Sequence, residues 1–128
     1  MIHTCPAAPI AELELRIAAS ALERSKSSGP DGITVEVYVQ LWSVFGQFLT
    51  AAFNACHASP HPQFTMRQRT SDYTLVPKCT DPTDPANRRP LAGIKSDVRN
   101  NARAISSRFA AGLNPIIDAT QTGFLPTR

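Results

Sequence analysis

Residues 73–94 read YTLVPKCTDPTDPANRRPLAGI and form the most informative stretch of the chain for its architecture. The run Tyr73–Val76 is rich in residues that favour β-strands, and Leu91–Ile94 is a second short apolar run. Between these runs, residues 77–90 contain four prolines, which predicts a long loop. The stretch therefore predicts a β-hairpin, with Asp81 and Asp84 in turns of its loop. Long loops of this kind in small domains are often functional.

Helical periodicity is found on both sides of the predicted hairpin. Residues 8–25 are expected to form a first helix, and residues 27–32, SSGPDG, form a turn cluster after it. The apolar face of the first helix is predicted to contain Ile10, Leu13, Ile17 and Ala21.

A second, longer helix is expected after the turn cluster, with Pro60 and Pro62 ending it. The stretch Val37–Met66 contains no Asp, Glu, Lys or Arg, a length that could span a membrane. Polar residues nevertheless recur in it at steps of three and four, which predicts a helix packed on a protein core and no membrane span. The predicted polar stripe consists of Gln40, Ser43, Gln47, Thr50 and Asn54. The predicted apolar side consists of Tyr38, Leu41, Trp42, Phe45, Phe48, Leu49, Ala52 and Phe53.

A third helix is expected to follow the hairpin. The hydroxyl of Ser96 could cap its start, and Asp97 would lie in its first turn, where the helix dipole favours an anion. Gly112 or residues 114–115 would end it. Its predicted apolar stripe is Val98, Ala102, Ile105, Phe109 and Leu113, and Arg99, Arg103 and Arg108 are expected to lie away from that stripe.

The composition is that of one small domain. The chain has 128 residues, of which 42% are hydrophobic and 18% charged, so disorder caused by high charge and low hydropathy is not expected. The net charge of +3 is distributed unevenly: residues 1–66 carry three basic and five acidic side chains, and residues 67–128 carry ten and five. A basic half is consistent with contact to phosphate or another polyanion, and also with a slightly basic solvated surface.

Several kinds of chemical site are not expected. The three cysteines contain no C-x-x-C pair, which argues against a zinc site or a disulfide framework. Cys56, His57 and His61 are close in sequence, but Pro60 separates the two histidines, and a helix end at the surface is the expected explanation. The sequence has neither a G-x-x-x-x-G-K-[ST] phosphate loop nor a G-x-S-x-G nucleophile elbow. The first residues do not resemble a signal peptide, which favours a reducing, intracellular compartment, nuclear or cytoplasmic.

Lys78 and Arg89 are the strongest candidates for a binding role. A hairpin over residues 73–94 would bring Lys78 close to Arg88 and Arg89 around its tip. An ammonium group and a guanidinium group on one hairpin suit a triphosphate or a nucleic-acid backbone. The alternative, which spacing does not exclude, is a hairpin with solvated basic ends.

Six short blocks together resemble reverse transcriptases of non-LTR, LINE-like retrotransposons. The resemblance covers residues 20–128, and each block is unspecific by itself, whereas six in the same order and spacing are specific. The blocks are GPDGI at 29–33, LVPK at 75–78 followed by DPTDPAN at 81–87, RPL at 89–91, SDVR at 96–99, residues 104–109, and QTGFLP at 121–126.

This resemblance implies an α+β fold corresponding to the fingers and upper palm of a right-hand polymerase. It divides the chain into an N-terminal linker helix at residues 1–26 and a partial reverse transcriptase domain at residues 27–128. It implies a piece of an RNA-directed DNA polymerase, a nucleotidyltransferase, in which Lys78 and Arg89 contact nucleotide phosphates. Gln121, Gly123 and Phe124 would lie on the template side.

The resemblance also implies what the complete enzyme would need. Its expected partners are an RNA template, a DNA primer and nucleoside triphosphates. Its two Mg²⁺ ions would be held by aspartates. In the family, those aspartates belong to blocks after the Q-T-G-F segment, and this sequence stops at Arg128. We therefore expect no catalytic residue, no metal ligand and no cofactor in this chain, and no polymerisation by it alone.

The sequence departs from the family at several positions. Arg88 stands where the family has an aromatic residue, Asn100 and Asn101 where it has a bulky apolar pair, and Thr127 where it has a glycine. Asn101 borders the predicted apolar stripe, where burying its amide without partners would cost about 1–3 kcal/mol.

Two further classes of function stay open. The first is a non-enzymatic nucleic-acid-binding remnant that uses the same hairpin. The second is a helical interaction module, whose face of Trp42, Phe45, Phe48 and Phe53 would dock a partner. If that face is left uncovered, the chain is expected to self-associate.

Overall fold

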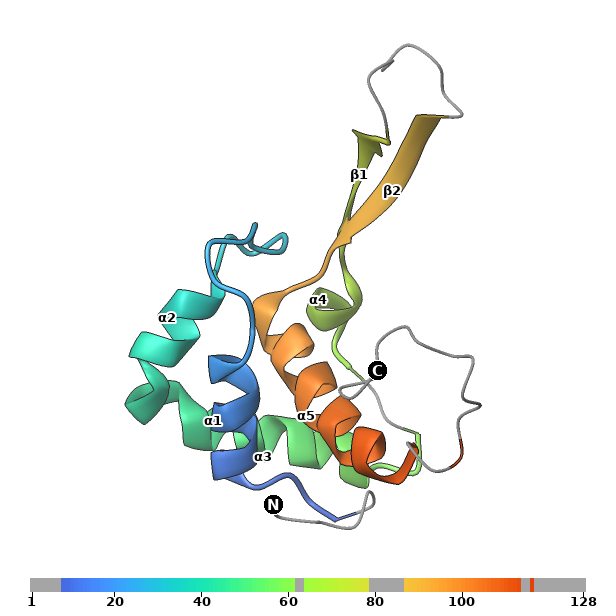
Figure 1. Cartoon of the computed structure of the whole chain (residues 1–128). Coiled ribbons are helices and arrows are strands. Elements are labelled where there is room, and N and C mark those ends of the chain that lie inside the picture. The colour runs from blue at the N-terminus through green and yellow to red at the C-terminus, as the bar shows by residue number, and fades with distance from the viewer. Residues whose placement is uncertain (1–7, 62–63, 79–86, 114–115, 117–128) are drawn as a thin grey trace.

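The helices form one body, and the hairpin projects from it (Figure 1). The computed structural model describes residues 8–61, 64–78, 87–113 and 116. In chain order, the elements of these residues are α1 (Glu12–Ser20), α2 (Val35–Gln40), α3 (Trp42–Ala58), α4 (Met66–Arg69), β1 (Asp72–Pro77), β2 (Arg88–Gly93) and α5 (Ser96–Leu113). The α+β class expected from the sequence is confirmed. The division at residue 26 stays a prediction.

The core lies where α1, α3 and α5 meet. Leu15 and Phe53 are fully buried there, and burying a side chain of this size stabilises the fold by about 1.5–3 kcal/mol. Ala18 and Ala19 of α1 and Ala104 of α5 are also buried. Because these three side chains are small, the two helices can approach each other closely.

The buried face of α1 differs from the predicted one. Leu13 and Ile17 are 55% and 59% exposed, and the helix is shorter than the predicted range of 8–25. The alanines at 18 and 19, with Leu15, face α3 and α5 instead. Periodicity alone favoured the larger side chains, whereas close helix packing selected the smaller ones.

The long second helix is interrupted at Leu41, whose φ of −99° and ψ of 24° separate α2 from α3. The predicted end before Pro60 is confirmed. The predicted apolar side is only half right: Trp42 and Phe53 are buried, whereas Phe45 and Phe48 are 38% and 65% exposed.

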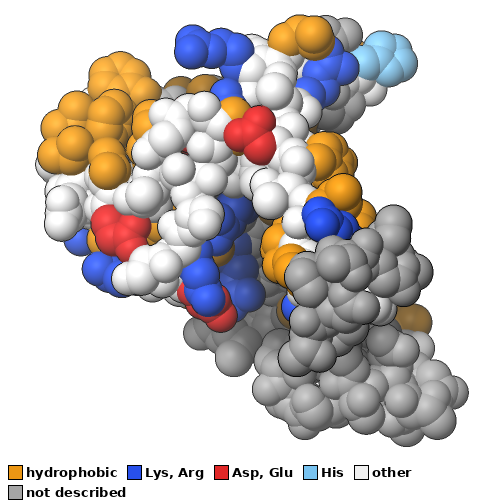
Figure 2. All heavy atoms as spheres, turned by 90° about the horizontal axis from the view of Figure 1, so that it is seen from above, with side chains coloured by type: hydrophobic (Ala, Val, Ile, Leu, Met, Phe, Trp, Pro, Cys, Tyr) orange, Lys and Arg blue, Asp and Glu red, His pale blue; other side chains and the backbone are white. Residues whose placement is uncertain are grey.

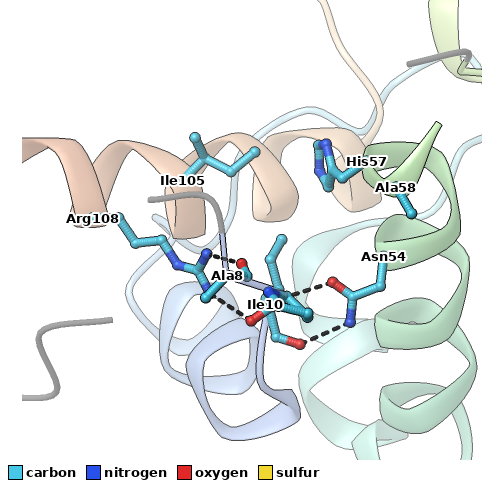
Figure 3. A pocket seen from close by; sticks show the side chains of 8 residues that line it. Ala8, Ile10, Asn54, His57, Ala58, Ile105 and Arg108 are labelled. Carbon is cyan, nitrogen blue, oxygen red and sulfur yellow. Dashed lines mark hydrogen bonds between the residues drawn. The ribbon is translucent and has the colours of Figure 1, made fainter. Parts of the chain in front are cut away.

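Two polar contacts explain this rotation of α3. The Asn54 side chain, predicted to face solvent, accepts a hydrogen bond from Ile10 N (2.7 Å) and donates one to Ile10 O (2.9 Å) (Figure 3). The Trp42 indole donates to Glu12 Oε1 at 3.2 Å, and it lies against Gly46, where any Cβ would collide with its ring. Both contacts turn the same side of α3 towards α1 and the segment before it.

The hairpin has the predicted antiparallel pairing, with Tyr73 opposite Ala92 and Val76 opposite Arg89. Almost all of its side chains are exposed on both faces. The bond from Lys78 N to Asn87 O makes that pair a hydrogen-bonded one. Hydrogen-bonded and non-hydrogen-bonded pairs alternate along the hairpin, so Pro77 and Pro90 lie in non-hydrogen-bonded pairs. At these positions the backbone nitrogen points away from the partner strand, so the missing N–H of proline does not interrupt the ladder. Both prolines also hinder a further strand from pairing with the free edges.

Helix α5 spans Ser96–Leu113, as predicted, but its buried residues include polar side chains beside Ala104. Asn100 and Asn101 are 3% and 2% exposed, whereas Phe109 of the predicted apolar stripe is 49% exposed. The predicted position of Arg108 away from the core is wrong, because its side chain is only 4% exposed. The predicted cap is also wrong, because the Ser96 hydroxyl donates to Ile33 O (2.9 Å).

Arg108 connects α5 to the start of α1. Its Nη2 donates to Glu14 Oε2 (2.7 Å), and its Nε donates to Glu14 Oε1. The guanidinium also donates to backbone carbonyls, from Nη1 to Ala8 O and from Nη2 to Pro9 O at 2.9 Å (Figure 3). A guanidinium held in this way can be buried without an uncompensated charge. The hydrogen bond from Arg108 lowers the pKa of Glu14, although partial burial opposes the shift.

Glu14→Gln is expected to lower the free energy of unfolding at pH 7 by about 3–5 kcal/mol, because it leaves Arg108 buried without its counter-charge. The lowered pKa means that the unfolded chain binds this proton more readily than the folded one. The stabilisation that ionised Glu14 contributes is therefore complete above the ordinary pKa of 4.5. It is lost as the pH falls through the lowered pKa of Glu14 in the folded chain. Urea unfolding at pH 7 and pH 3 should show the gap between wild type and variant narrowing in acid.

Glu23→Gln provides the matched control for that experiment. Glu23 pairs with Lys26 at 3.2 Å, but the two side chains are 77% and 58% exposed. Exposed pairs contribute little, so stability should change little at either pH. Equal losses in the two variants would contradict the role given to Arg108.

The buried asparagines of α5 differ in their hydrogen bonding. His57 donates through Nε2 to Asn101 Oδ1 at 3.2 Å, which joins α3 to α5. Both side-chain polar atoms of Asn100 are buried without a hydrogen-bond partner among the described residues. The sequence predicted a free-energy cost for an unpartnered buried amide at Asn101, and the structure places that cost at Asn100 instead.

Asn100→Leu is expected to raise the free energy of unfolding by about 1–3 kcal/mol, because it removes an unsatisfied buried amide and adds apolar burial. Asn101→Leu should lower it by about 1 kcal/mol, since the bond to His57 is lost. Thermal unfolding of the two variants should move the midpoint in opposite directions. A loss of stability in both would show that the Asn100 amide is satisfied in solution.

Candidate nucleic-acid interface

The base of the hairpin is held by the loop between α1 and α2. A Cβ on Gly29 would lie 2.6 Å from Lys95 Cα and 2.7 Å from Lys95 N, so only glycine allows this approach. Gly32 has a φ of 71°, and its N–H donates to Gly29 O at 3.0 Å, which closes the turn. With the bond from Ser96 to Ile33, these contacts fix the start of α5 and the exit from β2.

The same junction gathers two carboxyl groups and a phenol. Asp97 is half-buried at the start of α5 and accepts a hydrogen bond from Val98 N at 2.7 Å. Burial raises the pKa of Asp97, and the nearby charge of Asp31 adds to this effect. Burial, together with Asp97 and Asp31, raises the pKa of Tyr38 to about 12. Asp97 is therefore a helix-start residue, as its sequence position indicated, close to the GPDG loop.

The register places Lys78 and Arg89 on the same face of the hairpin. Arg89 is opposite Val76, and the Lys78 N–H donates to Asn87 O at 2.6 Å, which continues the ladder by one pair. Residues two apart on a strand share a face, so Lys78 lies diagonally across from Arg89. Both side chains are exposed. The two cations can therefore approach one polyanion from the same side.

The other face of the hairpin is mostly apolar. It carries Tyr73, Leu75 and Pro77 from β1, and Pro90 and Ala92 from β2. Arg88 pairs with Pro77 and therefore belongs to this second face. The sequence had grouped Arg88 with Arg89, but neighbouring residues of a strand point to opposite sides.

A second pair of arginines, Arg67 and Arg69, lies on α4 directly before β1, and both are exposed. This short helix was not predicted. Its start is stabilised by a capping box, in which Thr65 Oγ1 accepts from Gln68 N (3.3 Å) and Gln68 Oε1 accepts from Thr65 N (2.9 Å). The spacing T-x-x-Q was the available signal for it in the sequence.

Four exposed cations of the basic half, Arg67, Arg69, Lys78 and Arg89, have no acidic partner among the described residues. Between described residues, no carboxylate lies within 4.0 Å of the charged groups of Arg67, Arg69, Lys78 or Arg89. Figure 2, which looks onto the molecule from above, shows its Lys and Arg side chains at several separate places with apolar surface between them. On the face seen in this view, the Lys and Arg side chains of the described residues do not form one continuous basic patch.

Other kinds of site find no support in the described part of the chain. No three His, Cys, Asp or Glu side chains among its residues gather in a way that could hold a metal ion. None of its helices has the length and hydropathy to cross a bilayer. A hollow of about 530 Å³ beside Ile10, Asn54, His57 and Arg108 has its polar side chains occupied by bonds within the chain.

Part of the predicted site lies outside the described residues. This applies to the template-side candidates Gln121, Gly123 and Phe124, and to the loop residues Asp81 and Asp84. Cys56 and His57 are partly buried at the end of α3, where His57 contacts Phe64 edge-on in addition to Asn101.

Comparison with known proteins bears on the origin of the chain. No protein-family profile matches the chain. The chain is 30% identical over 124 residues to a protein of Xenopus laevis described as the transposon TX1 uncharacterized 149 kDa protein. The match covers 94% of this chain but only 9% of that protein. This similarity suggests that the chain is derived from a transposon.

Gly29→Ala is expected to lower the free energy of unfolding by about 1–3 kcal/mol, because backbone atoms of Lys95 must move to accommodate the methyl group. Gly112→Ala is the control: a Cβ there meets nothing within 4 Å, and alanine in a helix should stabilise by about 0.5–1 kcal/mol. Urea denaturation measures both. Equal stability of Gly29→Ala and wild type would contradict the close approach of loop and hairpin base.

Proposed function

We propose that the chain is part of a reverse transcriptase of a non-LTR retrotransposon and belongs to its fingers and upper palm. Three observations support this. Six sequence blocks occur in the order of that family, the sequence is similar to a transposon-encoded protein, and an exposed hairpin carries basic residues at its tip. Its role in the polymerase is to hold the RNA template and the incoming nucleotide.

The observation that carries the proposal is the common face of Lys78 and Arg89. A guanidinium can bind two phosphate oxygens at once, and an ammonium group adds a mobile point charge. Because both project from a hairpin with little cover on either side, a nucleotide or a nucleic-acid backbone can reach them. Lys78 and Arg89 are therefore the proposed phosphate contacts, and Gln121, Gly123 and Phe124 the proposed template contacts.

The two Mg²⁺ ions of such an enzyme do not fit the described residues. Two-metal phosphoryl transfer needs several carboxylates that converge on one point. In the described part of the chain, Asp97 accepts a backbone hydrogen bond at the start of α5, and Asp72, at the start of β1, is the one carboxylate among the described residues of the hairpin. The proposed contribution of these residues is substrate binding, and no chemical step is assigned to them.

A second candidate is a nucleic-acid-binding remnant without a nucleotide site. The observation that favours it is that Arg67 and Arg69, as well as Lys78 and Arg89, lack acidic partners among described residues. Exposed, unneutralised cations bind polyanions whether or not chemistry follows.

The double variant Lys78→Ala/Arg89→Ala is expected to weaken binding of a labelled RNA–DNA primer–template and to reduce its salt dependence. The slope of log K against log salt should fall in magnitude by about 0.7–0.9 for each phosphate that is no longer neutralised, so by about 1.4–1.8 in all. Fluorescence anisotropy at several salt concentrations measures it. Arg16→Ala removes one exposed charge from α1 and should leave the slope unchanged.

An unchanged slope in the double variant would contradict the proposed phosphate contacts. Titration with a nucleoside triphosphate separates the two candidates. The polymerase fragment should bind it through Lys78 and Arg89 and lose that binding in the double variant, whereas the remnant should not bind it.

A further inference from the structure

Arg99 and Arg103 lie on the outer side of α5, away from the core. Each is two positions from Asn101, which is 2% exposed and bonded to His57 of α3. Two residues turn a helix by about 200°, so both arginines lie about 160° around α5 from Asn101. Arg103 is exposed and Arg99 is partly exposed, which confirms the position expected for them from the sequence. We call these two residues the α5 arginine pair.

The α5 arginine pair has no acidic partner among the described residues. No carboxylate of that part of the chain lies within 4.0 Å of either guanidinium group. Asp97 is the only acidic residue in the sequence of α5, and it precedes Arg99 by two positions, which places it on another side of the helix. The outer side of α5 therefore carries two positive charges without a neighbouring acid of its own helix.

The spacing of the pair fits the backbone of a nucleic acid. Residues four apart are neighbours on a helix and are separated by about 6 Å along its axis. Like charges at this spacing repel each other, so the folding of α5 gains nothing from the pair. Phosphates of one strand follow one another at about 3.4 Å along the axis of a duplex. Two guanidinium groups at this separation can therefore bind phosphates that are one or two nucleotides apart, each through two oxygens.

The position of the pair distinguishes a strand from a single nucleotide. Lys95 joins β2 to α5, and its close contact with Gly29 fixes this junction. Arg89 lies four residues before the end of β2, which is about 13 Å along the strand. The hairpin projects from the helical body, whereas α5 runs into that body (Figure 1). A nucleotide held by Lys78 and Arg89 is therefore too short to reach α5, whereas a strand of several nucleotides can contact both places.

We propose that the α5 arginine pair is a second phosphate-contact surface, which binds the backbone of a single nucleic-acid strand that also reaches the hairpin. This inference rests on the proposed function, because it extends the same interface from the hairpin to the helical body. The cations of the hairpin and the similarity to a transposon-encoded protein favour a nucleic acid over an acidic protein as the occupant.

The double variant Arg99→Ala/Arg103→Ala of the 128-residue chain tests the proposal. Its binding of a labelled single-stranded RNA should be weaker, and the slope of log K against log salt should fall in magnitude by about 1.4, because each phosphate of a single strand contributes about 0.7. Fluorescence anisotropy measures this slope, and binding of a nucleoside triphosphate should stay unchanged. Arg99→Lys/Arg103→Lys keeps both charges and should keep the slope.

Thermal unfolding separates this role from a structural one. Alanine favours the helix and removes the repulsion between the two arginines, so the unfolding midpoint of the alanine variant should not fall. Weaker RNA binding by a variant of unchanged stability therefore reports a lost contact. A lower midpoint together with an unchanged salt slope would show that the pair serves the fold, and would overturn the proposal.

Arg16→Ala/Lys26→Ala is the matched control, because it removes the same charge from exposed residues outside α5 and should leave the slope unchanged. An unchanged slope in the α5 variant, beside a reduced slope in Lys78→Ala/Arg89→Ala, would overturn this inference alone. Unchanged slopes in both would contradict the proposed function as well. Loss of nucleoside triphosphate binding in the α5 variant, or a loss of polyglutamate binding equal to the loss of RNA binding, would also overturn the assignment to a nucleic-acid strand.

Discussion

The contact of Gly29 with the backbone of Lys95 is the constraint on which the arrangement of the chain depends. It brings a loop from the first quarter of the sequence against the point where β2 ends and α5 begins. The hydroxyl of Ser96 adds a hydrogen bond to Ile33 at the same place. Because the hairpin touches little else, this junction sets the direction in which Lys78 and Arg89 project from the helical body (Figure 1). A residue with no side chain thus controls the placement of the candidate interface.

Most elements could be predicted from the sequence, apart from α4 and the break at Leu41, whereas the buried faces could not. The proline-rich loop flanked by β-forming runs predicted the hairpin, and Ser96 predicted the start of α5. Of the two stops that the sequence offered, Gly112 lies inside the helix, which ends at Leu113 directly before residues 114–115. The faces of α1, α3 and α5 depend instead on contacts between distant residues. Asn54 bonds to Ile10, and Arg108 to Glu14, and these bonds bury polar side chains that periodicity assigns to solvent. Hydropathy measures the average tendency of a side chain, and a specific long-range partner overrides it.

For the candidate site, too, the sequence predicts which residues to consider but not which face of the hairpin they share. The sequence singled out Lys78 and Arg89 only as candidates, and the pairing of Val76 with Arg89 was needed to place them on one face and Arg88 on the other. A shift of the strand register by one residue would have exchanged these two faces. The arginines of α4 were missed because a four-residue helix has no hydrophobic period, although its capping box was visible in the sequence.

The distribution of buried and exposed groups links stability to binding. Among the described residues, the Asn100 amide is buried without a partner, whereas several large apolar side chains of α1 and α3 are exposed. Part of the apolar surface that could stabilise the core therefore remains in contact with solvent. The hairpin, a two-stranded sheet exposed on both faces, gains little from the rest of the chain. Any ligand that binds the folded hairpin stabilises it in proportion to the logarithm of its concentration above the dissociation constant. Binding of a polyanion at Lys78 and Arg89 would therefore stabilise the folded hairpin, which gains little stability from the helical body. In that case, binding and folding of the hairpin would be coupled.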